Sequence, residues 1–532
     1  MIDLLEGASS HTIPYYLLLL PLFFLSLTYL ALKSTNSGRR KLPPSPPWGL
    51  PIFGHSGFMK PPIHRILHAL AQRHGPIFSL RLGTRPAVVV SSAALAEECF
   101  TKNDVAFANR PRFTMAKHIH YNYTTMTHAP YGGHWRNLRR IGSLEIFSAH
   151  RLAASLPIRR EEVRRLVANL VRRTDGGPAV VEMKSAFQEL TFDTMMRMVA
   201  GKRFYSDDEE ARGFREVIKE VVARAGASNR ADFGAVLRWI DGGKLERTAR
   251  ELAGRTDSFL QKLIEERRRN TMIDHLLALQ ESEPENYSDQ IIKGLVMMER
   301  VRCTLQNEIH FQYFFRKKFY CLSLPTAYHM VMLLAGTDTL SVTLEWALAN
   351  LLNHPNILLK AREEIDKQIG QERLIDEPDI SNLTYLQNII VETLRLYPAG
   401  PLLVPHASSE DCVVGGYHVP RDTILLVNAW AIHRDPNLWD DPTSFIPERY
   451  ENEGKESYKM IPFGLGRRSC PGVGLAHRFM GLTLGILIQC FEWERVSEEE
   501  VDMTEGKGAT MPREKPLEAI CTSRPIVKNF FS

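Results

Sequence analysis

The sequence predicts a mainly helical protein with small β-sheets, attached to a membrane through its N-terminus. Three observations support this fold class. Segments with apolar residues at helical spacing are long, whereas strand-like runs are few and short. An apolar run of bilayer length lies near the start of the chain. Finally, 532 residues, of which 44% are hydrophobic, can bury one large core.

The predicted helices and strands follow one another from residue 71 onward. Ala71 to Leu82, followed by Ala87 to Ser92, is typical of a helix end, a turn and a pair of strands. Asn353 to Ile369 and Leu383 to Leu396 have helical spacing beside charged faces. The other strand-like runs are two short ones, Leu402 to Val404 and Thr423 to Val427. These elements favour small sheets within a helical domain.

Residues 1–32 are predicted to form a single-pass membrane anchor. Ile13 to Leu32 is almost entirely apolar, and about 20 residues at 1.5 Å per residue match the thickness of a bilayer core. The cations that follow favour a cytosolic position for the rest of the chain: Lys33, Arg39, Arg40 and Lys41. A cleaved secretory signal is the alternative, but its charges would precede the apolar run.

A basic and proline-rich linker is predicted over residues 33–53. The prolines between Pro43 and Pro51 exclude a helix and favour a short, stiff spacer. Because no second linker and no internal repeat follow, residues 54–532 are expected to form one large domain.

Charge and cysteine content exclude several classes of function. A formal net charge of +5, with basic residues spread along the chain, gives no reason to expect a nucleic-acid partner. Seven cysteines without a C-x-x-C pair argue against a disulfide framework or structural zinc site and favour a reducing compartment. His64 and His68 stand four apart and could share a metal ion. With no third ligand nearby, a solvated helix face is the preferred interpretation of these histidines.

The decapeptide from Phe463 to Gly472 places a cysteine in a glycine-rich loop. Gly466 and Gly472 can adopt backbone angles barred to other residues, so the loop can project the sulfur of Cys470 and point N–H groups toward it. The proline after the cysteine suits the first turn of a helix through Ala476 to Leu484, whose positive end would face the sulfur. We expect these features to lower the pKa of the thiol and to favour a metal-bound thiolate.

Five motifs, in order along the chain, resemble those of the cytochrome P450 family. The decapeptide fits the haem-ligand pattern F-x-x-G-x-R-x-C-x-G at every fixed position. The other four are Trp135 to Arg139 (W-x-x-x-R), Ala335 to Thr339 (the oxygen-binding motif), Glu392 to Arg395 (E-x-x-R) and Pro447 to Arg449 (P-E-R). Each short motif is weak by itself, but five in order are specific. Within the family, the chain looks most similar to plant microsomal enzymes related to isoflavone hydroxylases.

The resemblance implies the cytochrome P450 fold, with residues 54–532 as the catalytic domain and haem b as its cofactor. Cys470 would be the axial ligand of the haem iron. The other residues implied to contact the haem or its propionates are Trp135, Arg139, His406, Phe463, Arg468 and Gly472. Glu392, Arg395 and Arg449 would form a buried ion network that holds the cysteine loop.

The resemblance also implies a substrate pocket and a route for protons. Thr339 and Asp338 would deliver protons to the reacting oxygen. The residues implied to line the pocket are Tyr121, Leu334, Ala335, Thr339, Leu402, Leu403 and Met511.

The implied activity is the insertion of one oxygen atom from O2 into a small, largely apolar, aromatic or phenolic plant metabolite. Electrons would come from NADPH through NADPH–cytochrome P450 reductase, docked near Arg467 and Arg478. The enzyme would be anchored in lipid of the endoplasmic reticulum membrane, with its catalytic domain in the cytosol. Two alternatives are the closure of a methylenedioxy bridge and a catalytically inactive membrane protein.

The segment from Met298 to Met330 departs from the family pattern. Joining residue 297 directly to Val331 would produce one continuous helix into the oxygen-binding motif, yet 33 residues intervene without a sustained helical face. Pro325 would cost roughly 3 kcal/mol inside a helix. We interpret the segment as translated intron or another gene-model error. The alternative is a surface loop, whose closure costs little extra with length.

Overall fold

The computed structural model describes residues 21–26, 28, 41–204, 209–224, 229–265, 271–272, 274–275, 278–279, 327–451 and 458–531. Most of the predicted anchor, and residues 33–40 of the predicted linker, lie outside the described residues. Residues 21–26 of the anchor are helical and exposed. The anchor stays a prediction.

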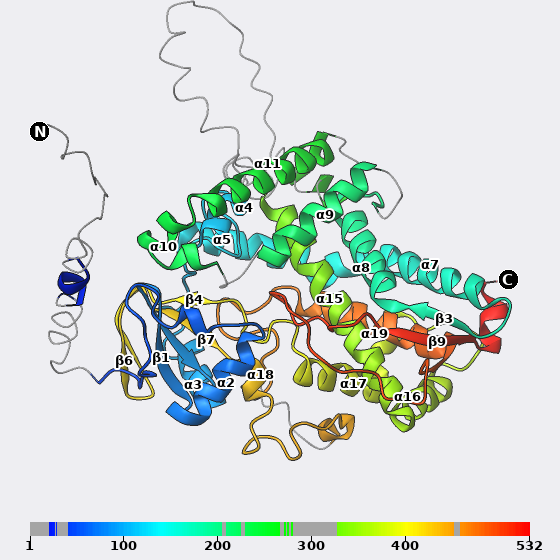
Figure 1. The fold of residues 1–532 in the computed structure, drawn as a ribbon. Coiled ribbons are helices and arrows are strands. Elements are labelled where there is room, and N and C mark those ends of the chain that lie inside the picture. Colours follow the sequence, from blue (N-terminus) through cyan, green and yellow to red (C-terminus); the bar gives the residue numbers. More distant parts are fainter. Residues whose placement is uncertain are drawn as a thin grey trace, which may run out of the picture.

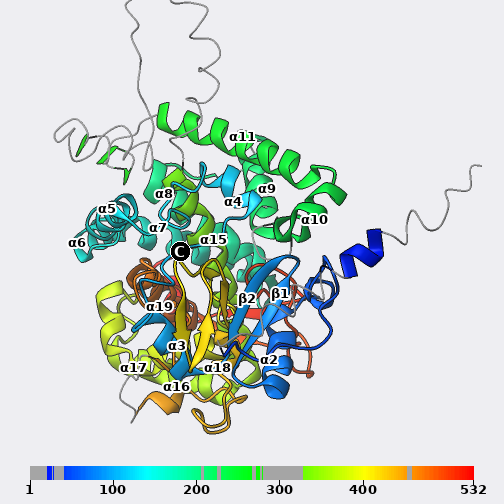
Figure 2. The same cartoon turned by 90° about the vertical axis from the view of Figure 1, so that its left-hand side faces the viewer.

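The domain is mainly helical, with α15 (Ala327–Asn353) crossing its middle and α11 (Lys244–Glu265) at one end in both views (Figure 1, Figure 2). Every residue from 340 to 352 is buried, as expected for a helix that is apolar on all sides. The remaining helices are α2 (Ile63–His74), α3 (Ala93–Phe100), α4 (Thr114–Ile119), α5 (Gly133–Ile141), α6 (Ala149–Ala154), α7 (Leu156–Thr174), α8 (Met183–Ala200), α9 (Glu209–Arg224), α10 (Ala235–Ile240), α16 (Pro355–Gln368), α17 (Thr384–Leu396), α18 (Ala429–Ile432) and α19 (Val473–Cys490).

Among the described residues, three small sheets accompany the helices, as the sequence predicted. The largest has the order β1 (Ile77–Leu82), β2 (Arg85–Val90), β7 (Ile424–Val427) and β4 (His406–Ala407). Strands β1 and β2 form an antiparallel hairpin, and β2 pairs with β7 in parallel, with Val89 opposite Leu426. The other two sheets are β3 (Ala179–Glu182), β9 (Glu518–Ser523) and β8 (Phe491–Glu494), and the pair β5 (Cys412–Val414) and β6 (Tyr417–Val419).

The strand predicted over Leu402 to Val404 is wrong. Leu403 has a φ of +53°, in the left-handed region, which ends an extended conformation. The carbonyl of Val404 accepts a hydrogen bond from the side chain of Arg110 at 2.7 Å instead of pairing with a strand. The strand in this part of the chain begins two residues later, at His406.

Helix α19 follows the cysteine loop and is a core helix. Among the described residues it is the one helix long and apolar enough to span a membrane, but 72% of that window is buried inside the domain. Gly481 and Gly485 allow its close approach to Ile380 and Ile375, because an added Cβ would lie 2.7 and 3.0 Å from those side chains. The helix therefore fixes the cysteine loop against the centre of the domain.

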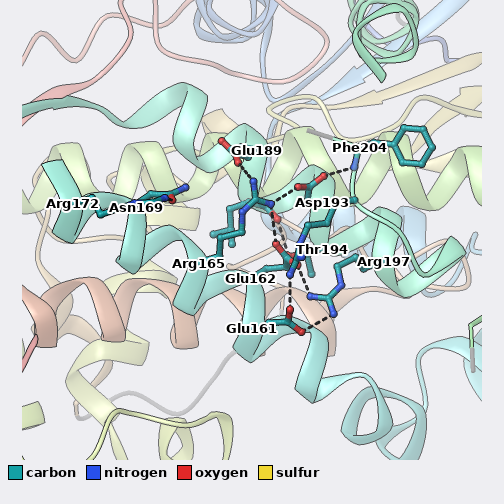
Figure 3. Close-up of polar contacts among 12 residues, drawn as sticks. Glu161, Glu162, Arg165, Asn169, Arg172, Glu189, Asp193, Thr194, Arg197 and Phe204 are labelled. Atoms are coloured by element: carbon teal, nitrogen blue, oxygen red, sulfur yellow. Dashed lines mark hydrogen bonds and ion pairs between the residues drawn. The ribbon is translucent and has the colours of Figure 1, made fainter. Parts of the chain in front are cut away.

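A charged network ties α7 to α8 (Figure 3). Arg165 of α7 contacts Glu189 at 2.7 Å and Asp193 at 2.9 Å, both on α8. Arg197 of α8 contacts Glu161 at 2.7 Å and Glu162 at 2.5 Å on α7. Each of these arginines has two acidic partners, so no cation of the network is left without a counter-charge.

The solvated helix face predicted for His64 and His68 is wrong for His64. His64 is buried, and its Nε2 lies 2.7 Å from Glu505 Oε2, which Arg65 also contacts at 2.9 Å. The partner comes from a segment 441 residues away, so helical spacing could not predict it. No group of metal-ligating side chains occurs among the described residues.

Of the suspected insertion, residues 298–326 lie outside the described residues. Helix α15 begins at Ala327, so the last four residues of the segment are helical. The helical segment predicted over Asn353 to Ile369 is interrupted near its start. Helix α15 ends at Asn353, and α16 begins at Pro355 after a break at His354.

Candidate active site

The loop that contains Cys470 is closed by a hydrogen bond from its N–H to the carbonyl of Phe463, at 2.9 Å. Gly466 has a φ of +68°, and a Cβ there would lie 2.5 Å from Asp104 Oδ1, so this position requires glycine. Gly472 has an ordinary φ of −89°, and the prediction of a special backbone angle is wrong for it. Its N–H nevertheless lies 3.4 Å from the sulfur, as expected.

The side chain of Cys470 is exposed, although protein surrounds it closely enough that burial raises the pKa of the thiol above its ordinary value. The hydrogen bond from Gly472 and the charge of Arg139 lower this pKa by less. The predicted lowering is therefore wrong for the chain by itself, because the desolvation of a thiolate outweighs both contacts. Helix α19 begins at Val473, so Pro471 precedes its first turn.

Arg468 lies in the cysteine loop, and its guanidinium contacts backbone carbonyls. It donates to Ala108 at 2.7 Å, to Met126 at 3.1 Å and to Ala129. Its guanidinium also lies 4.5 Å from the centre of the Trp135 ring. Burial, and then the charge of Arg139, lowers the pKa of Arg468 to about 9.

Arg110, which the sequence motifs did not indicate, lies beside Arg468. It donates to the carbonyls of Thr127 at 3.3 Å and Pro405 at 2.9 Å. Burial, and then the charge of Arg468, lowers the pKa of Arg110 to about 9. Within the described part of the chain, neither arginine has a carboxylate partner.

The other residues expected around the haem converge on the same region. Arg139 donates to the carbonyl of Ser469 at 2.7 Å, and Trp135 donates through Nε1 to the carbonyl of Met126 at 2.9 Å. His406 Nδ1 contacts the carbonyl of Phe107 at 2.7 Å, and the charges of Arg110 and Arg468 help to lower its pKa after burial. Four cationic or hydrogen-bonding side chains from distant segments thus surround one edge of the cysteine loop.

This donor set fits haem. Two partly buried guanidiniums that repel each other, without an acid, favour an anionic ligand, and haem has two carboxylates. The exposed sulfur of Cys470 can also bind the iron of a haem.

The predicted ion network is present and buried. Both oxygens of Glu392 contact Arg395 at 2.7 Å, and Arg449 contacts Glu392 at 3.2 Å. Tyr450 also donates to Glu392 at 3.0 Å. Glu392 and Arg395 are fully buried. Each charge is out of contact with water and therefore needs the other as its partner.

His433, which no motif indicated, links this network to the cysteine loop. The carbonyl of His433 accepts from Arg395 at 2.7 Å, and its Nδ1 lies 3.1 Å from the carbonyl of Arg395. Its Nε2 accepts the N–H of Ile461 at 3.0 Å, and the carbonyl of Ile461 then accepts from Gly464 in the loop at 3.0 Å. Burial lowers the pKa of His433 to about 3, so the ring is a neutral acceptor.

Thr339 and Asp338 lie on α15, as the motif requires, and have different partners. The hydroxyl of Thr339 donates to the carbonyl of Ala335 at 2.5 Å, and Ala335 is exposed although it lies on the central helix. Asp338 accepts from Thr510 at 2.6 Å. Burial raises the pKa of Asp338 above its ordinary value, while Thr510 and Lys184 lower it by less.

Asp338 also lines a cleft of about 240 Å³ between α8, α9, α15 and residues 507–512. Lys184, Lys219 and Glu345 are among the polar residues of its wall. The cleft gives solvent a path to the carboxyl of Asp338.

The residues expected to line the substrate pocket differ in their burial and in their contacts. Tyr121 is buried, and its hydroxyl donates to Asp257 of α11 at 2.9 Å. Leu402 and Leu403 are partly buried, and Leu403 lies against Gly464 of the cysteine loop. Met511 is fully buried beside Trp430, which leaves it little accessible surface. The side chain of Leu334 lies outside the described residues.

Comparison with known proteins agrees with this site. The cytochrome P450 family model matches residues 43–519. The chain is 52% identical to cytochrome P450 81E8 of Medicago truncatula, covering 97% of this chain and 98% of the relative. It is 49% identical to an isoflavone 3′-hydroxylase of the same plant, covering 97% and 99%. It is 48% identical to the (+)-piperitol/(+)-sesamin synthase CYP81Q2 of Sesamum radiatum, covering 95% of each.

A solved structure, a zebra fish cytochrome P450 with progesterone, has a TM-score of 0.68 at 24% identity and covers 88% of this chain and 100% of that chain. This likeness supports the fold. Because the family model spans most of the domain and the relatives match almost end to end, the chain belongs to the cytochrome P450 family, in its plant CYP81 subfamily.

Proposed function

We propose that this cytochrome P450 monooxygenase hydroxylates a small, largely apolar aromatic plant metabolite of the isoflavone type, with electrons from NADPH. The observation that carries the reaction class is the exposed sulfur of Cys470 in a loop whose Arg468, like the neighbouring Arg110, has no acid partner among the described residues. The similarity to an isoflavone 3′-hydroxylase supports the substrate class.

Haem, when bound, supplies the activation of O2 and the transfer of one oxygen atom to the substrate. The protein contributes binding and orientation. Cys470 is proposed as the axial ligand, and Arg468, Arg139, Trp135 and His406 as the residues that hold the carboxylates. We add Arg110 to this set, because its guanidinium lies beside Arg468 and has no acid partner in the part of the chain that the structure describes. Phe463, Gly472 and the Glu392 network hold the ligand loop in position.

Asp338 and Thr339 are proposed to move protons. The raised pKa of Asp338 favours a carboxyl that holds a proton at Oδ and can pass it on. The cleft beside Asp338 supports resupply from solvent. The hydroxyl of Thr339, one residue further along α15, is proposed to accept the proton from Asp338. In the structure this hydroxyl contacts the carbonyl of Ala335.

The reductase is proposed to dock on the face that contains Arg467 and Arg478. In the structure Arg467 lies 3.5 Å from Asp104 and Arg478 lies 3.1 Å from Glu377, so both cations are partly neutralised. Arg136 on α5 is also exposed, and we propose it as a further cation of this docking face. Raising the salt concentration should slow the reduction of the protein by the reductase. An Arg136→Glu variant should be reduced more slowly at low salt and should depend less on the salt concentration.

One experiment tests the reaction class and the substrate together. The purified chain without residues 298–330 should give the strongly red-shifted Soret band of a thiolate-ligated haem when reduced under carbon monoxide. With reductase and NADPH it should hydroxylate members of an isoflavone panel. Absence of the band would favour the inactive-protein alternative.

A second candidate function is the closure of a methylenedioxy bridge. The observation that favours it is the similarity to the (+)-piperitol/(+)-sesamin synthase. Product analysis with ortho-methoxyphenols separates the two reactions, because ring closure removes two hydrogen atoms whereas hydroxylation adds one oxygen.

We further propose that the working enzyme lacks residues 298–330 or most of them. The absence of a sustained helical face there supports this interpretation. Sequencing the transcript tests it directly: a dominant message that encodes the whole segment would sink the idea. The shortened chain should bind haem and turn over, whereas the full chain should be weak or inactive, because α15 must align Thr339 only about two to three turns after the segment.

A further inference from the structure

Two histidines that the proposed mechanism does not use lie next to the cysteine loop. The rings of His120 and His128 are stacked, with centroids 3.9 Å apart and planes 22° apart. Both belong to the segment between α4 and α5, whose carbonyls at Met126 and Thr127 accept from Arg468 and Arg110. The pair therefore lies at the edge of the proposed haem site.

Two threonine hydroxyls connect the rings. Thr125 Oγ1 lies 3.2 Å from His120 Nδ1 and 2.9 Å from Thr127 Oγ1, and Thr127 Oγ1 lies 3.0 Å from His128 Nδ1. Among the described residues, neither Nε2 atom has a hydrogen-bond partner. Each ring is thus held at one nitrogen and available at the other.

Both rings are neutral. Burial lowers the pKa of His120 to about 4, and burial followed by the charges of His120, Arg110 and Arg468 lowers the pKa of His128 well below its ordinary value. Both residues nevertheless keep part of their surface accessible.

Proton counting restricts what the two rings can offer. Three contacts of 3.2 Å or less join His120, Thr125, Thr127 and His128 in a chain, and the two hydroxyls supply only two protons to them. A fourth contact, from Thr127 Oγ1 to His120 Nδ1, is longer, at 3.4 Å, and lies outside the usual range of a hydrogen bond. The third proton must come from Nδ1 of one ring. If every hydroxyl proton is used, that ring presents a bare Nε2 acceptor, and the other ring presents an Nε2–H donor. Reversing the direction of the chain exchanges the two roles but keeps one of each.

The backbone holds this segment in a restricted conformation. Tyr121, Asn122 and Tyr123 have φ values of +47°, +54° and +62°, a left-handed turn that costs non-glycine residues energy. Side-chain contacts hold the turn, among them Tyr121 to Asp257 at 2.9 Å and Tyr123 to the carbonyl of Phe113 at 3.1 Å. A strained turn held at both ends is typical of a binding site.

We propose that His120 and His128 together bind a neutral hydroxyl group of the substrate, donating one hydrogen bond to it and accepting one from it. A hydroxyl matches this pair because it both donates and accepts, whereas a carboxylate only accepts and an ether oxygen cannot donate. The inference rests on the proposed function and narrows it to substrates that already contain a phenol or alcohol.

The test uses 4-fluorophenol and its methyl ether, 4-fluoroanisole, with the haem-loaded full chain. Their dissociation constants are measured by fluorine NMR, which needs no turnover. The wild-type protein should bind the phenol about tenfold more tightly than the ether, as two buried hydrogen bonds would predict. A ratio near one in the wild type would overturn the proposal.

Three kinds of variant locate the effect. His120→Phe and His128→Phe preserve ring stacking and should bring the ratio to within about twofold of one. His134→Gln is the matched control, because His134 contacts only the carbonyl of Thr124 at 2.9 Å and the amide can still donate. It should keep the wild-type ratio. If the phenylalanine variants fail to fold, Thr127→Val tests the same chain with both rings intact and should lose the preference, whereas Thr127→Ser should retain it.

Haem content distinguishes the hydroxyl site from a role toward the cofactor. Loss of haem in both phenylalanine variants with an unchanged phenol-to-ether ratio would assign the rings to the haem carboxylates and overturn the proposal. The proposed function is judged separately, by the carbon monoxide spectrum and isoflavone turnover. A protein that fails those tests but keeps the phenol preference would lose its proposed substrate and keep the hydroxyl site.

Discussion

The α7–α8 network and the edge of the cysteine loop use the same kind of side chain in opposite ways. In the first, Arg165 and Arg197 each have acidic partners within 3 Å (Figure 3). In the second, Arg110 and Arg468 donate hydrogen bonds only to carbonyls among the described residues. The arginines of the first group already have their counter-charges, whereas cations that repel each other favour an added anion. The difference would separate residues that hold the fold from residues proposed to hold a ligand.

The Glu392 network belongs to the first kind and lies close to the second. It is fully paired and buried, and His433 connects it to the cysteine loop. A fold-holding network thus positions a ligand-holding loop without contacting the ligand. Variants in the two regions should therefore fail in different ways.

The largest expected effect is that of Cys470→Ala. It should abolish monooxygenase activity and the thiolate spectral signature, because no other cysteine among the described residues lies in a comparable loop. Cys412→Ala, at a half-buried strand position, is the control and should keep both. Retention of the red-shifted band in the Cys470 variant would mean that the axial ligand has been misassigned.

The next effect is on folding. Glu392→Gln should destabilise the domain by about 3–5 kcal/mol, because it leaves Arg395 buried without a compensating charge. Urea denaturation followed by tryptophan fluorescence measures the loss. An unchanged midpoint would show that the carbonyl partners of Arg395 are sufficient by themselves.

Arg468→Met sharpens the comparison, because it should weaken haem binding while leaving the fold largely intact. We expect at least about tenfold faster haem loss to apomyoglobin, since a charge-assisted contact to a carboxylate is removed. Arg165→Met is the matched control: it should keep haem and lose about 1 kcal/mol of stability. Equal haem loss in both variants would contradict the distinction between the two regions.

The sequence predicted the parts of the site that lie within one local segment. The cysteine loop and the Glu392–Arg395 pair depend on spacings of a few residues, and the structure confirms their geometry. Arg110 and His433 were missed because the chain path brings them to the site from elsewhere: Arg110 reaches carbonyls almost 300 residues away. No local signal distinguishes them.

Two errors have the same cause. The burial of His64 depends on Glu505, 441 residues downstream, and the turn at Leu402–Leu403 depends on a left-handed backbone angle that leucine rarely adopts. Helical and strand periodicity predict exposure and extension only when no distant segment intervenes. The prediction of a lowered pKa for the thiol of Cys470 was wrong for a related reason. The extent of desolvation depends on how the loop is packed, which the local sequence does not show.

Thr339→Ala should leave haem bound but separate electron use from product formation. Removal of the hydroxyl interrupts proton movement from Asp338, so peroxide should rise severalfold as product falls. Thr339→Ser should restore most of the coupling. Unchanged coupling in the alanine variant across several substrates would show that Asp338 or water supplies the protons without Thr339.

The smallest expected effect concerns Asp338 and the pH dependence of stability. Burial raises its pKa, so the folded chain binds this proton more tightly than the unfolded chain. The contribution of this group to stability is therefore greatest below the ordinary carboxyl pKa and falls as pH rises through the raised value. Asp338→Asn does not ionise, and its amide oxygen can still accept from Thr510.

The Asp338→Asn variant should therefore have a Tm about 1–2 °C above the wild type at pH 8, and the difference should vanish near pH 4. Glu345→Gln should behave in the same direction, because burial also raises the pKa of Glu345. Lys184 acts against the shift at both positions. A variant less stable than the wild type at pH 8 would mean that the attraction of Lys184 exceeds the cost of burial, and that Asp338 remains charged beside the cleft.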